Sequence, residues 1–165
     1  MKKSRIYKTV LAGLFAATIY VTTTFISIPL GLGYANLGDC FVLLSGLFLG
    51  PVYGFCAAAV GSALADLTLG WTIYAPVTFF IKGIMSVIFC FFTKNQKVLP
   101  LKACVGAITC ELLMVCAYLG FELFIYGNGA WASVPGNIIQ GAVGAVGAVL
   151  LTLTAKKLNF TNKIL

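Results

Sequence analysis

Residues 75–93 read APVTFFIKGIMSVIFCFFT, a run of 19 residues in which Lys82 is the only charged side chain. At about 1.5 Å per residue, a helix of this length spans close to 30 Å, which is the thickness of the hydrocarbon core of a bilayer. The stretch therefore predicts a membrane-spanning helix. It also places one lysine at a depth where a charged side chain is costly, which marks a candidate functional residue.

The rest of the chain has the same character. Of its 165 residues, 61% are hydrophobic and only 9% are charged, so a soluble domain of this size would lack the polar surface it needs. We expect an all-α membrane protein, a single domain over residues 1–165 that forms a bundle of six transmembrane helices with a short second helix. The expected helices are Ile6–Ile28, Cys40–Leu49, Val52–Leu69, Ala75–Thr93, Lys102–Tyr126 and Ser133–Ala155.

The basic residues predict the orientation of this bundle. With six spans and a cytoplasmic start, ten of the eleven lysines and arginines fall on the cytoplasmic side, and the outer loops hold none. This is the bias that membrane proteins show for positive charge inside the cell. We therefore expect both termini in the cytoplasm. The ten residues are Lys2, Lys3, Arg5, Lys8, Lys94, Lys97, Lys102, Lys156, Lys157 and Lys163.

Polar side chains at membrane depth gather in the outer half of the predicted bundle. Lys82 lies about seven residues from the outer end of its helix, and Asn137 and Gln140 lie in the first two turns of the last helix. Glu111, Tyr118 and Glu122 share one face of the fifth helix. This convergence predicts a pocket that opens to the exterior. A purely structural alternative remains open, in which Lys82 pairs with Asp66 and Asp39 caps the second helix.

Several signatures of catalysis are missing from the sequence. There is no histidine, the six cysteines form no CxxC pair, and no GxxxxGK[ST] phosphate loop or nucleophile elbow occurs. We expect no enzymatic activity, no cofactor and no metal. A pocket without its own energy source is typical of a binding subunit that depends on partner proteins.

The chain resembles the S component, the substrate-binding subunit, of an energy-coupling factor (ECF) transporter, in the subgroup of riboflavin or hydroxymethylpyrimidine transporters. The resemblance covers nearly the whole chain. Its most specific motifs are Asn36-Leu37-Gly38-Asp39, Leu49-Gly50-Pro51, Gly61-Ser62-Ala63-Leu64-Ala65-Asp66, Tyr74-Ala75-Pro76, Ile81-Lys82-Gly83 and Pro135-Gly136-Asn137-Ile138-Ile139-Gln140-Gly141.

The resemblance implies a multi-pass protein of a prokaryotic plasma membrane, with an outward pocket beneath the first loop. Its implied partners are a transmembrane coupling (T) subunit and two cytoplasmic ATPase subunits, which drive uptake. Ala12 and Ala16 match the small-residue motif with which family members dock the coupling subunit. No nucleic-acid partner is expected.

The implied ligand is a vitamin or vitamin precursor. We expect a small flat heteroaromatic of the pyrimidine or pyridine type, such as hydroxymethylpyrimidine or pyridoxine, with riboflavin next. Trp71, Tyr74 and Trp131 suit either a stacking wall or the interfacial aromatic belt. The candidate substrate-binding residues are Asn36, Asp39, Asp66, Tyr74, Lys82, Glu111, Trp131, Asn137 and Gln140.

Two other classes of function remain as alternatives. A small membrane enzyme could use Asp39, Asp66 or Glu111 with a metal, but the missing histidine and the scattered acids disfavour it. A small channel or ion-coupled carrier is the other alternative. Carriers usually consist of two repeated halves, and the sequence shows no such repeat.

Overall fold

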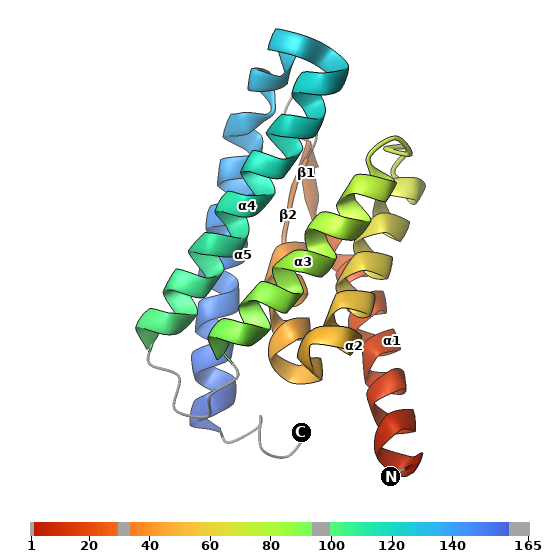
Figure 1. The fold of residues 1–165 in the computed structure, drawn as a ribbon, viewed down its shortest axis with the longest axis vertical. Helices are drawn as coiled ribbons and strands as arrows, with labels where there is room; N and C mark the ends of the chain where they lie inside the picture. The colour runs from red at the N-terminus through yellow and green to blue at the C-terminus, as the bar shows by residue number, and fades with distance from the viewer. Residues whose placement is uncertain (1, 30–33, 94–99, 159–165) are drawn as a thin grey trace.

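The computed structural model describes residues 2–29, 34–93 and 100–158 (Figure 1). Within these residues, five helices are long and apolar enough to cross a membrane. In chain order the elements are α1 (Lys2–Phe25), β1 (Ser27–Pro29), β2 (Tyr34–Asn36), α2 (Gly38–Thr68), α3 (Ala75–Thr93), α4 (Pro100–Tyr126), the 3₁₀ helix η1 (Gly127–Ala132) and α5 (Val134–Lys157).

The helix predicted for residues 75–93 has the same bounds as α3. The helices predicted for 102–126 and 133–155 agree with α4 and α5 to within two residues at each end. An uninterrupted apolar run fixes these bounds because its ends coincide with turn-forming or charged residues. The sequence also predicts a cytoplasmic loop over Lys94–Pro100. Residues 94–99 of it lie outside the described residues, and Pro100 is the first residue of α4.

The first predicted helix extends too far. It was expected to reach Ile28, but α1 ends at Phe25 and the chain continues into β1, which pairs antiparallel with β2 in the register Ser27↔Asn36. Ile28 is a β-branched residue that suits a strand, and Pro29 cannot continue a helix. A short β-hairpin therefore stands where the sequence predicts only a helix end and a loop.

The second and third predicted helices, Cys40–Leu49 and Val52–Leu69, are the two arms of α2. Gly50 has φ +79° and ψ −178°, a conformation suited to glycine, and Pro51 follows it. The hydrogen bonds show that the chain reverses here: the Ser45 hydroxyl donates to the carbonyl of Gly54 over 3.2 Å, a contact that a straight helix would not allow. Nine residues of a straight helix would rise about 13.5 Å. We call residues 38–49 the first arm of α2 and residues 51–68 its second arm.

The bundle core lies between α2, α3 and α4. The Ser45 and Ser86 hydroxyls hydrogen-bond over 2.9 Å, and Gly46 lies against the main chain of Ser86, so the first arm of α2 approaches α3 closely. The outer surface is apolar: the Phe124 side chain is 91% exposed and Phe25 is 74% exposed. An apolar exterior around a core with buried polar groups is the arrangement that a lipid environment requires.

The two ends of the bundle differ in what they carry. The start of α1, the turn at Gly50 and the end of α5 lie at one end, and η1 and the α2–α3 connection lie at the other (Figure 1). The Lys156 ammonium donates to the carbonyl of Thr93 over 3.2 Å, which ties the end of α5 to the end of α3. We call the end with the start of α1 and the end of α5 the lysine-rich end. We call the opposite end the hairpin end, because β1 and β2 lie on that side of the start of α2.

Candidate functional site

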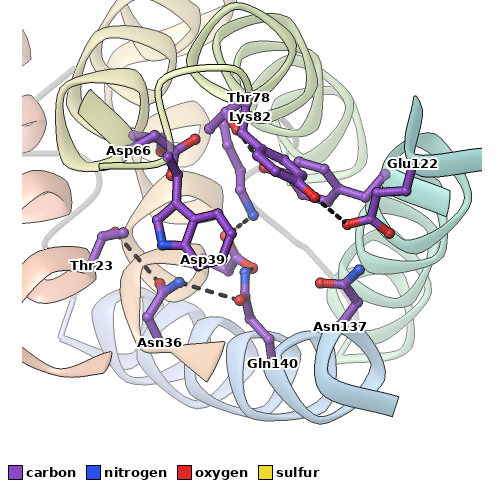
Figure 2. A pocket seen from close by; sticks show the side chains of 13 residues that line it. Thr23, Asn36, Asp39, Asp66, Thr78, Lys82, Glu122, Asn137 and Gln140 are labelled. Carbon is purple, nitrogen blue, oxygen red and sulfur yellow. Dashed lines mark hydrogen bonds and ion pairs between the residues drawn. The ribbon is translucent and has the colours of Figure 1, made fainter. Parts of the chain in front are cut away.

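A pocket lies in the half of the bundle toward the hairpin end, and five helices and β2 contribute to it (Figure 2). It forms above the start of α2, because the first arm of that helix is only about half as long as its neighbours. Its lining is mostly polar, with an aromatic side. The lining residues are Thr23, Asn36, Asp39, Ser62, Asp66, Trp71, Tyr74, Thr78, Lys82, Tyr118, Glu122, Asn137 and Gln140.

One wall of the pocket is a continuous chain of side-chain hydrogen bonds. The Thr23 hydroxyl donates to Asn36 Oδ1 over 3.5 Å, and Asn36 Nδ2 donates to Gln140 Oε1 over 3.2 Å. Gln140 Nε2 in turn donates to Asp39 Oδ2 over 2.6 Å. Asn36 Oδ1 also accepts the main-chain N–H of Gly38 over 2.7 Å, which fixes the turn from β2 into α2. The wall therefore joins α1, β2, α2 and α5.

The chain ends in a buried ion pair between α2 and α3. Lys82 Nζ lies 2.5 Å from Asp39 Oδ1, and the two side chains are 6% and 1% exposed. Lys82 also donates to Met114 Sδ over 2.9 Å and lies 5.6 Å from the centroid of the Tyr118 ring. Such a pair is stable in a low-dielectric interior only when the remaining polar atoms are also satisfied, as Gln140 does for Asp39.

Two expectations about these charges are corrected by the structure. Lys82 pairs with Asp39 and not with Asp66, because the first arm of α2 brings Asp39 against α3. Asp39 does not cap α2, since the N-cap residue is Leu37 and no side-chain capping bond forms there. Asp39 lies inside the first turn, where its carboxylate faces α3 and α5.

A second polar cluster lies on the side formed by α3, α4 and η1. Glu122 accepts hydrogen bonds from the Tyr74 hydroxyl, over 3.1 Å, and from the Ser133 hydroxyl. Thr78 and Tyr118 hydrogen-bond over 2.8 Å. Burial raises the pKa of the Tyr74 phenol above its usual value, and the nearby Glu122 carboxylate adds to that shift. Tyr74 is therefore a hydrogen-bond donor at neutral pH.

Aromatic rings form the remaining side. The Trp71 and Tyr74 rings meet edge to face with centroids 5.7 Å apart, and the Tyr74 and Phe121 rings do so at 5.5 Å. Trp71 comes from the α2–α3 connection and lines the pocket. Flat apolar surface beside fixed polar groups is the usual composition of a small-molecule site.

The structure brings together most of the residues that the sequence singles out. Seven of the nine candidates line the pocket, and two do not. Trp131 is 59% exposed on η1, and Glu111 is buried deeper, against the glycines of α5. The seven are Asn36, Asp39, Asp66, Tyr74, Lys82, Asn137 and Gln140. Whether they contact a ligand stays a prediction.

Six lining residues are absent from the candidate set. Some carried a usable signal: Thr78 lies four residues before Lys82, and Glu122 shares a helix face with Tyr118. Thr23 and Ser62 gave no such indication, because a serine or threonine hydroxyl inside a helix usually bonds to the main chain of its own helix. Among the described residues, no group of three or more His, Cys, Asp or Glu side chains could hold a metal ion.

The comparisons with known proteins agree with this architecture. A family model described as "ECF-type riboflavin transporter, S component" matches residues 3–157. A protein of Pyrococcus woesei, described as an uncharacterized protein in the gap 3'region, is 33% identical over 132 residues, which cover 79% of this chain and 88% of that protein.

The buried ion pair leads to a prediction about stability. Replacing Lys82 by methionine keeps an unbranched side chain, one atom shorter, but leaves the Asp39 carboxylate without its counter-ion. Lys82→Met should therefore lower the free energy of unfolding by about 3–5 kcal/mol. The double variant Lys82→Met/Asp39→Leu should recover most of this loss, because neither charge remains. Unfolding of the purified proteins in a lipid–detergent mixture measures both values. Strictly additive losses would show that the two groups are not coupled.

Proposed function

Because this chain belongs to the family of S components of ECF-type riboflavin transporters, we propose that its pocket captures a vitamin or vitamin precursor from outside the cell for uptake. Proteins of this family are membrane-integral, and the five apolar helices fit a multi-pass protein of the plasma membrane. The main support for the proposal is the pocket, in which polar side chains from separate helices lie together beside aromatic rings at one end of the bundle.

The ligand that suits this lining is a small flat heteroaromatic with hydrogen-bonding substituents. Trp71 and Tyr74 supply a surface for a ring, and Asn137 offers a donor and an acceptor. Among the described residues, Lys82 donates to two partners, which leaves the third donor of its ammonium for a ligand. A pyrimidine or pyridine, such as hydroxymethylpyrimidine or pyridoxine, is our first choice, and riboflavin is the second.

Asn137 and Gln140 differ in a way that separates binding from folding. Both line the pocket from α5, but Gln140 is bonded to Asn36 and Asp39. No hydrogen bond joins the Asn137 side chain to another described residue, and its amide points into the pocket (Figure 2). Asn137 is therefore our primary candidate for a direct ligand contact.

This difference predicts distinct effects of two substitutions. Asn137→Ala should weaken ligand binding by about tenfold to a hundredfold, since a lost hydrogen bond in a buried site costs about 1–3 kcal/mol. It should leave the melting temperature of the ligand-free protein unchanged. Gln140→Ala should weaken binding and also lower that melting temperature. Titration of each purified variant with hydroxymethylpyrimidine, pyridoxine and riboflavin, beside a ligand-free melt, tests both. Unchanged affinity in both variants would place the site elsewhere.

We also propose six membrane-crossing segments, with each arm of α2 counted once and both termini in the cytoplasm. The reversal at Gly50 supports two arms, and the basic residues favour the lysine-rich end as the cytoplasmic one. The first arm rises only about 18 Å, so it crosses part of the bilayer inside the bundle, where protein surrounds it.

The topology predicts which positions a membrane-impermeant thiol reagent reaches. In a background without the six native cysteines, new cysteines at Thr72 and Asn128 should react in intact cells. Cysteines at Val52 and Lys102 should react only after permeabilisation; all four positions are exposed. A Val52 cysteine that reacts from outside, or under neither condition, contradicts the two-arm model.

We propose that α1 docks the coupling subunit, which acts with two cytoplasmic ATPases. Ala12 and Ala16 are half-buried, and the carbonyl oxygen of Ala16 lies 2.5 Å from the position that a Cβ on Gly61 would take. That side of α1 therefore packs against α2 as well. Gly13 has open space around it and Ala17 is exposed four residues later, so these two extend the small-residue surface to the lipid-facing side.

The docking proposal predicts that a bulky residue on this surface uncouples binding from uptake. Ala17→Leu should reduce the amount of coupling subunit that co-purifies with the protein and should leave ligand affinity unchanged, because a larger side chain blocks close helix approach. Ala142→Leu, at an exposed position on α5, is the matched control and should have no effect on co-purification. Equal loss in both variants would remove α1 as the specific interface.

A further inference from the structure

Glu111 on α4 is the acidic residue that the pocket does not use. Its side chain is 5% exposed, and no donor among the described residues reaches either carboxyl oxygen. It fits against α5 only because that helix has glycines here. A Cβ on Gly144 would lie 2.9 Å from Glu111 Oε1 and 2.7 Å from Asp39 Cβ, so the two acidic side chains meet at the same glycine.

The charges around Glu111 leave it without a counter-ion of its own. From α2 it faces Asp39 and the thiol of Cys40, from its own helix Cys110, and from α3 Lys82. The glycines of α5 supply no titratable group. The one cation in this set is Lys82, which is bonded to Asp39 over 2.5 Å. A second carboxylate here would be a buried, unpaired negative charge, which is among the most costly groups in a protein interior.

We propose that Glu111 is a proton-binding site: it holds a proton in the resting protein and serves as the reserve counter-ion of Lys82. While Lys82 is paired with Asp39, the neutral carboxylic acid is the form that fits the site. When Asp39 cannot take the positive charge, Glu111 loses its proton to solvent and its carboxylate balances Lys82. This role is separate from ligand binding, because Glu111 is not part of the pocket lining.

Infrared difference spectroscopy of the full chain in lipid nanodiscs tests the first half of the proposal. A buried protonated carboxylic acid has a carbonyl stretch that a carboxylate lacks and that shifts in D₂O. We expect this band at neutral pH in the unaltered protein and its loss in Glu111→Gln, which keeps the shape of the side chain. Glu122→Gln is the control and should retain the band, since two hydroxyl donors already serve that carboxylate. A band that survives in Glu111→Gln overturns the proposal.

The variant Asp39→Asn tests the second half. Its folded form should lack the protonated-acid band, because Glu111 becomes the partner of Lys82. The double variant Asp39→Asn/Glu111→Gln should melt well below either single variant, since Lys82 then has no carboxylate. A band that persists in folded Asp39→Asn overturns the reserve role. If Asp39→Asn does not fold, the proposed rescue by Glu111 fails and is likewise overturned. A site for a metal cation instead of a proton would give no band in the unaltered protein and a melting temperature that rises with added Na⁺.

Discussion

Placing an ammonium group at membrane depth is the constraint on which the rest of this bundle depends. Lys82 needs a carboxylate within hydrogen-bond distance, and Asp39 supplies it from the first turn of α2. That turn can lie at this depth only because the first arm of α2 is short and reverses at Gly50. The space above the arm is then enclosed by the β-hairpin and by α5, from which Gln140 donates a hydrogen bond to the second carboxylate oxygen of Asp39. One buried charge thus accounts for the helix break and for the polar wall of the pocket.

The polar residues of the pocket are of two kinds. Some are hydrogen-bonded to other side chains and so join the helices, and others have side-chain groups that can still bond to a ligand. Gln140 is hydrogen-bonded to both Asn36 and Asp39, and Glu122 is hydrogen-bonded to Tyr74 and Ser133. Removing any of them leaves a buried partner without its bond, so loss of stability accompanies any loss of affinity. Asn137 has no such bond among the described residues, and this makes it the clearest reporter of ligand contact.

The parts of this structure that the sequence predicts are those that depend on one helix at a time. The apolar run of 75–93 gives the bounds of α3, and the depth of Lys82, Asn137 and Gln140 along their helices predicts a shared pocket. The choice of Asp39 over Asp66 was not predictable, because helical periodicity gives the face of a residue and not the relative height of two helices. That height is set by the close contact of Gly46 with Ser86. The β-hairpin was missed because three-residue strands have no periodicity to detect.

The shortness of the first arm also has a consequence for translocation. In the proposed topology the floor of the pocket, at Asp39, lies about 15 Å above the cytoplasmic face of a hydrocarbon core about 30 Å thick. Under the proposed function, a captured molecule has then already passed roughly 15 Å of that core before any subunit moves. The mechanical work left to the proposed ATP-driven partners is to expose that molecule to the cytoplasm, across about half the thickness of the bilayer.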